Sequence, residues 1–151
     1  MERFQRITSV SARVMLGSLF VVIGFNGLLR FARMPEPTLE GGAFLAALYA
    51  TGYMIPLIKC TEIIAGFMLF FRPASALALV VLAPIVINIV AFHTILDPGG
   101  VPMAMTVLAL ALYAAWHERA AYRGLFARGD EAQPAGGGKL WTRLRPRSLA
   151  L

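Results

Sequence analysis

The residues with the clearest chemical potential are two charged side chains inside an apolar run. Glu62 lies in the stretch from residue 54 to 71, and Lys59 precedes it by three positions. A charge at the centre of a membrane-spanning helix costs roughly 2.5–3.5 kcal/mol on insertion scales, so such a residue is a candidate for function. The spacing places both side chains on one helix face, where they can pair. Glu62 could exchange a proton, or the pair could fix helix packing, and the sequence leaves both interpretations open.

Three more polar residues occur in the neighbouring apolar stretches. Asn26 is near the end of the first stretch, Asn88 is about one turn from the end of the third, and His93 is at its edge. Because successive spans alternate in direction, we expect these residues and the charged pair in the outer half of the bilayer. Together they form a candidate intramembrane polar site for a ligand or a partner. The competing interpretation is a set of interhelical hydrogen bonds, worth about 0.6 kcal/mol each.

Metal, haem and thiol chemistry have little support in the sequence. His93 and Asp97 have i, i+4 spacing but lack a third ligand, and His117 is expected at the opposite face of the membrane. The two histidines therefore cannot hold one haem iron. Cys60 is the only cysteine, which excludes an internal disulfide and a C-x-x-C pair. We expect no metal site and no catalytic residue, and quinone is the one candidate cofactor.

The elements that carry these residues are apolar helices. The chain has 151 residues, of which 58% are hydrophobic and 15% charged, whereas soluble domains are roughly 25% charged. Four stretches, at about 10–29, 54–71, 74–92 and 101–116, approach the roughly 20 residues that cross the hydrocarbon core. A short apolar patch at 43–50 predicts an interfacial or re-entrant helix. The predicted fold is all-α, a four-transmembrane-helix bundle over residues 1–125 followed by a flexible basic tail at 126–151.

Glycine and proline positions predict how these helices pack and bend. Gly17 and Gly24 share one face of the first helix, and Gly66 follows the charged pair by about one turn. Small residues allow close approach of membrane helices. Pro84 lies in the middle of the third span and is expected to kink it. The sequence from 97 to 100, Asp-Pro-Gly-Gly, predicts a turn.

The net charge of +6 is distributed around the apolar stretches rather than along one surface. Basic residues beside apolar spans indicate topology and lipid contact, so we expect no nucleic-acid binding. Most of the arginines fall on one side of the predicted membrane, which places both chain ends in the cytoplasm. Arg13, at the start of the first span, is expected to extend toward the inner headgroups, with an inward-turned pairing to an acid as the alternative.

Several short motifs together resemble the DoxX family of membrane proteins. They are Ala12-Arg13 with Gly17, Gly24-Phe25-Asn26-Gly27, Thr51-Gly52-Tyr53, Glu62 with Gly66, Ala83-Pro84 with Asn88, and Phe92-His93 before Leu96-Asp97. The resemblance covers about residues 10–120 and implies a four-helix protein of the bacterial cytoplasmic (inner) membrane, mostly of unassigned function. Similar proteins include the small membrane subunit of archaeal thiosulfate:quinone oxidoreductase and a mycobacterial member associated with redox-defence enzymes. More distant relatives act as chaperones in receptor assembly.

Three functions therefore remain open from the sequence. The first is an accessory or quinone-interacting subunit of a membrane redox system, in which Glu62 exchanges a proton near the quinone and Asn88 or His93 binds a quinone carbonyl. The second is a scaffold or assembly chaperone that binds partner proteins through its helices. The third is a small transporter, which would have to oligomerise. Expected partners are the lipid bilayer, other membrane or redox proteins, and further copies of this chain.

Overall fold

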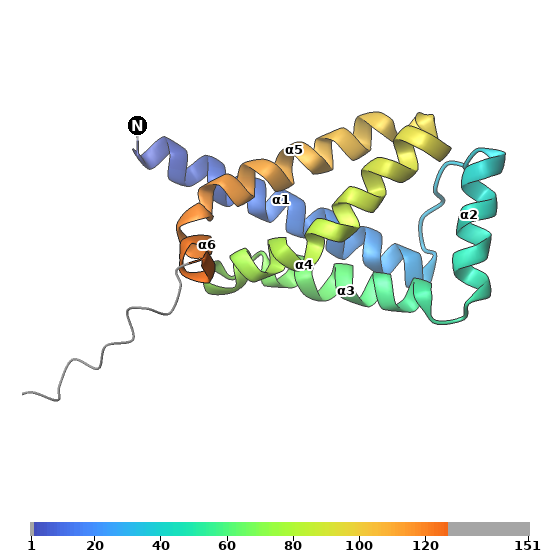
Figure 1. Ribbon diagram of the computed structural model, residues 1–151, viewed down its shortest axis with the longest axis horizontal. Helices are drawn as coiled ribbons and strands as arrows, with labels where there is room; N and C mark the ends of the chain where they lie inside the picture. The colour runs from blue at the N-terminus through green and yellow to red at the C-terminus, as the bar shows by residue number, and fades with distance from the viewer. Residues whose placement is uncertain (1, 127–151) are drawn as a thin grey trace, which may run out of the picture.

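The computed structural model describes residues 2–126, with side chains from 7 to 122, and consists of helices joined by short connections (Figure 1). The tail beyond residue 126 lies outside the described residues. The helices are α1 (Glu2–Leu29), α2 (Leu39–Ala50), α3 (Met54–Met68), α4 (Arg72–Ala91), the π-helix η1 (Phe92–Leu96), the 3-10 helix η2 (Pro98–Gly100), α5 (Val101–His117) and α6 (Arg119–Phe126). Residues 2–126 contain no strand, which confirms the all-α prediction.

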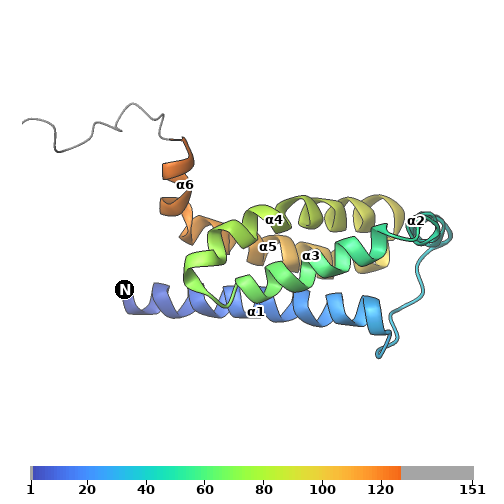
Figure 2. The ribbon, with the colours of Figure 1, turned by 90° about the horizontal axis from the view of Figure 1, so that it is seen from below.

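Four of these helices, α1, α3, α4 and α5, pack side by side into a bundle (Figures 1 and 2). Helix α1 packs against α3 and α5, and α4 packs against α3 and α5, so the four form a closed ring. The centre of the ring is apolar. Its fully buried side chains include Leu16 and Phe20 from α1, Leu82 from α4 and Val107 from α5.

Three apolar helical stretches are long enough to cross a membrane: Ile7–Leu29, Arg72–Leu96 and Pro98–His117. Helix α3 has 15 residues, a rise of about 22 Å at 1.5 Å per residue, which is shorter than the roughly 30 Å hydrocarbon core. It reaches membrane length only together with α2, from which it is bent by 94°. The described residues thus provide three membrane-length helices, or four if the bent pair counts as one span.

The helix expected at 54–71 ends early, at Met68, because the turn to α4 uses apolar residues. Phe70 and Phe71 donate their N–H groups to Phe67 and Met68 at 3.1 Å, so the last turn tightens. Pro73 then begins α4 in its first turn, where the missing N–H costs little. Because the residues of this turn are as apolar as the helix before it, hydropathy could not predict where the helix ends.

Helix α2 lies across one end of the bundle, whereas α6 and the chain's N-terminus lie at the other (Figure 1). It begins at Leu39, before the predicted patch at 43–50, because Thr38 caps it: Thr38 Oγ1 accepts a hydrogen bond from Gly41 N at 3.1 Å. It ends before Gly52, whose φ of 75° makes the turn into α3. We call these ends of the bundle the α2 end and the α6 end.

Candidate functional site

The charged pair on α3 is formed and almost enclosed. Lys59 Nζ donates to Glu62 Oε1 at 3.0 Å and to Oε2 at 2.8 Å. The side chains are 19% and 3% exposed, respectively, so the carboxylate is the more deeply buried partner. Lys59 is the only hydrogen-bond donor to this carboxylate among residues 7–122. The sequence-based pairing is therefore present in the structure.

Glycines of α1 enclose the Lys59–Glu62 pair. A Cβ added to Gly24 would lie 2.6 Å from Ile63 Cγ1 and 3.1 Å from the Lys59 carbonyl oxygen. A Cβ added to Gly27 would lie 2.6 Å from both Cδ and Cε of Lys59. Helix α1 can approach the pair because these positions carry no side chain.

The other two packing glycines lie further toward the α6 end, where α1 and α3 touch through their backbones. A Cβ added to Gly17 would lie 2.8 Å from the Gly66 carbonyl oxygen, and one added to Gly66 would lie 3.0 Å from the Gly17 carbonyl oxygen. Both glycines therefore serve packing within this chain rather than contact with another protein.

The structure places the five residues of the predicted polar site in different surroundings. Asn26 is buried, but its Oδ1 accepts the Ala32 N–H at 2.7 Å and closes the end of α1. His93 belongs to a different cluster at the α2 end. Asn88 is exposed on α4, and so is Pro84, so neither side chain packs inside the bundle. Their surroundings differ because shared depth fixes the height of a residue along the bundle but not the direction in which its helix face points.

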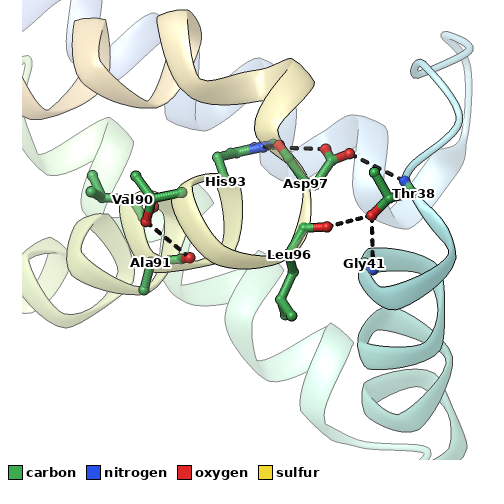
Figure 3. A network of polar contacts seen from close by, with 8 residues as sticks. Thr38, Gly41, Val90, Ala91, His93, Leu96 and Asp97 are labelled. Atoms are coloured by element: carbon green, nitrogen blue, oxygen red, sulfur yellow. Dashed lines mark hydrogen bonds and ion pairs between the residues drawn. The ribbon is translucent and has the colours of Figure 1, made fainter.

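His93 takes part in a network that ties the connection before α2 to the π-helix η1 (Figure 3). His93 Nδ1 lies 3.3 Å from Asp97 Oδ2, and Asp97 Oδ1 accepts the Thr38 N–H at 3.2 Å. The Thr38 hydroxyl donates to the Leu96 carbonyl oxygen. Gly100 makes room for the imidazole, because a Cβ there would overlap the ring. The network joins segments about 60 residues apart and thereby fixes α2 across the bundle.

Thr38 is the residue on which this attachment depends, since it caps α2 and bonds to Leu96 at once. We expect Thr38→Ala to lower the free energy of unfolding by about 1–2 kcal/mol and to speed tryptic cleavage at Arg33 in detergent micelles. Thr94→Ala is the matched control, because the Thr94 hydroxyl bonds only to carbonyls of its own helical turn. Equal effects of the two substitutions would contradict the assigned role of Thr38.

A cavity of about 310 Å³ opens at the α2 end, beside the charged pair. It is lined by Gly27, Leu28, Arg30, Tyr49, Gly52, Ile55 and Pro56, from α1, α2, α3 and their connections. The Arg30 guanidinium lies over the Tyr49 ring, with Cζ 5.4 Å from the ring centroid, a favourable cation–π geometry. Gly27 contributes to the cavity wall and also abuts the Lys59 stem. One glycine therefore separates the cavity from the ion pair.

Arg30, which lines this cavity, has an unfavourable backbone conformation. Its φ is 53°, the one positive value among the described residues other than glycine. This left-handed position ends α1, and glycine is the residue usually found there. Such strain concentrates at functional sites. No sequence pattern indicated this conformation, because Arg30 was one of the arginines considered only for their distribution across the membrane.

A second buried ion pair, whose acidic partner the sequence did not identify, lies at the α6 end. Arg13 Nη1 donates to Glu118 Oε1 and to Ser75 Oγ, both at 3.2 Å, and the Ser75 and Glu118 oxygens are 2.7 Å apart. Arg13 therefore turns inward to an acid, the alternative that the sequence left open, and does not extend to the headgroups as first expected. Glu118 could not be recognised as its partner because it lies in the break between α5 and α6, outside every predicted span. The pair connects α1, α4 and the start of α6.

Tyr122 on α6 adds to this cluster. Its hydroxyl donates to the Ala76 carbonyl oxygen at 3.2 Å. Burial raises the pKa of the hydroxyl above its usual value, and the nearby Glu118 carboxylate raises it further. Tyr122 thus stays protonated as a donor and anchors α6 to α4.

No three His, Cys, Asp or Glu side chains in the described part of the chain lie close enough to hold a metal ion. No family model, curated protein or solved structure matches this chain. A functional proposal therefore depends on the geometry of the cavity and the two ion pairs.

Proposed function

We propose that this chain is an accessory, quinone-interacting subunit of a membrane redox system of the DoxX type. In this proposal it crosses the bacterial cytoplasmic membrane four times, with both ends in the cytoplasm and the α2 end facing outward. The observation that carries the proposal is the cavity in which Arg30 lies over Tyr49 beside the Lys59–Glu62 pair.

The chemistry of the cavity suits a quinone headgroup. Leu28, Ile55 and Pro56 supply apolar walls, and the Arg30 guanidinium supplies N–H donors that can bond a ring carbonyl oxygen. The volume is at the lower end of the roughly 300–1,000 Å³ typical of small-molecule sites, as expected for a ring whose isoprenoid tail remains in lipid. The proposed site is thus formed by Arg30 and Tyr49, and no longer by Asn88 or His93.

Glycine at position 30 offers a sharp test, since it removes the guanidinium while relieving the unfavourable φ. We expect Arg30→Gly to keep or slightly raise the thermal stability and to weaken binding of a short-chain quinone analogue by about 10-fold or more, the loss of one charge-assisted hydrogen bond. Equilibrium dialysis against protein in nanodiscs measures the affinity.

Arg33→Ala is the matched control, because it removes a positive charge three residues away that does not line the cavity. Its quinone affinity should equal that of the unaltered protein. Failure of the unaltered protein to bind any quinone analogue, or equal binding by Arg30→Gly, would contradict the proposal.

The second candidate, a scaffold that binds partner helices, is favoured by the polar Asn88 on the outer surface of α4. Under this function the glycines Gly17, Gly24 and Gly66 are not the contact surface, since they face neighbouring helices of the same chain. Binding would use the outward faces of α4 and α5.

A further inference from the structure

One face of α4 combines exposed apolar side chains with polar groups at membrane depth. Leu77, Val80, Pro84 and Asn88 are all exposed, and their spacing of three to four residues places them on one stripe. The stretch Arg72–Leu96 is long enough to cross the hydrocarbon core. Asn88 is four residues from its midpoint, about 6 Å along the helix, so a single bundle would present this amide to lipid.

The Asn88 carboxamide has no hydrogen-bond partner among the described residues. A polar group placed in hydrocarbon without a partner costs several kcal/mol. Membrane helices commonly satisfy such a group by hydrogen bonding to another helix.

A second polar group on the same stripe lacks its usual partner. Pro84 lies inside α4 and has no N–H, so it cannot donate to the carbonyl oxygen of Val80, one turn earlier. Val80 is 52% exposed, so the missing helical hydrogen bond falls on the outward-facing part of α4. The unpartnered Asn88 carboxamide and the interrupted helical hydrogen bond lie on one stripe, which favours a helix-binding surface.

We propose that this stripe binds the same stripe of a second copy of the chain across a two-fold axis. A carboxamide carries both donor and acceptor groups, so Asn88 of each copy can satisfy its counterpart. A two-fold interface requires this self-complementarity. The stripe carries no charge that would need an opposite charge on a different protein. Since it shares no residue with the cavity, the proposal is independent of quinone binding.

Thiol cross-linking tests which face is paired. In a Cys60→Ser background, Val80→Cys should form a covalent dimer with a short thiol-specific cross-linker in proteoliposomes. Leu112→Cys is the control, because it is exposed on α5 at a similar distance from the α2 end. It should remain monomeric at the same lipid-to-protein ratio.

Asn88→Leu tests the amide itself. Because Asn88 is exposed, the substitution should leave the helical circular dichroism and the unfolding midpoint unchanged. It should weaken dimerisation by about 3- to 30-fold, measured by single-molecule photobleaching over a lipid dilution series. Asn88→Gln, which keeps a carboxamide, should retain most of the association.

Three outcomes would overturn the proposal. The first is equal dimerisation of Asn88→Leu and the unaltered protein. The second is equal cross-linking at positions 80 and 112. The third is a protein that stays monomeric at every dilution. The same conclusion would follow if the α4 stripe cross-linked only to a different membrane protein.

Discussion

Replacing Lys59 with methionine should destabilise the protein by about 3–5 kcal/mol, because the Glu62 carboxylate would then lie buried without its partner. Glu62 is only 3% exposed, and both of its oxygens accept hydrogen bonds from Lys59 Nζ. Methionine preserves the length of the side chain over Gly27, so the packing of α1 on α3 changes little. The free energy of unfolding in mixed micelles, followed by circular dichroism, measures the loss.

Two further variants separate charge from packing. Glu62→Gln keeps an acceptor for Lys59, which is 19% exposed and closer to solvent, so its cost should be about 1–2 kcal/mol. The double variant Lys59→Met with Glu62→Leu removes both charges and should recover most of the loss. If the double variant is no more stable than Lys59→Met alone, an unpaired carboxylate is not the cause.

The sequence predicted the pair for a physical reason: residues three apart on a helix are neighbours whatever surrounds them. The cap before α2 is also a local contact, between Thr38 and Gly41, but it was recognised only in the structure. Properties set by near neighbours along the chain can thus be predicted, and so can the helices themselves, since length and hydropathy determine them.

Properties that depend on helix rotation could not be predicted. Glu62 and Asn88 are at comparable predicted depths, yet one is buried and the other exposed. The direction of each helix face depends on the ring of four helices, in which α1 is in close contact with α3 through glycine. The sequence left the direction of Arg13 open for the same reason, since its partner Glu118 is brought near only when α1 packs on α5.

The cavity was missed for a different reason. Its volume arises where α1 ends, α2 crosses the bundle and α3 begins, and no single segment encodes it. Arg30 has a left-handed backbone conformation that no residue pattern predicted. The residues proposed to bind quinone therefore emerged only from the arrangement of three helices.

We expect substitution of glycine by alanine to have opposite effects on the free energy of unfolding at two positions, because only one of them lies in the contact between α1 and α3. Gly66→Ala should lower the free energy of unfolding by about 2–3 kcal/mol, because the new methyl group would lie 2.9 Å from Val21 Cγ2 and 3.0 Å from the Gly17 carbonyl oxygen. A backbone atom cannot move aside as a flexible side chain can, so the two helices must separate.

Gly42→Ala should instead raise the free energy of unfolding by about 0.5–1 kcal/mol, the usual gain in helix propensity. Gly42 lies in α2, and the nearest atom to an added Cβ would be Pro37 Cγ at 3.8 Å, an ordinary contact. Both variants are measured by the same unfolding titration in mixed micelles. Because the intrinsic propensity term is the same at both positions, the difference between them, about 3 kcal/mol, reports the close approach of α1 and α3. Two values of the same sign and size would show that these helices do not touch through their backbones.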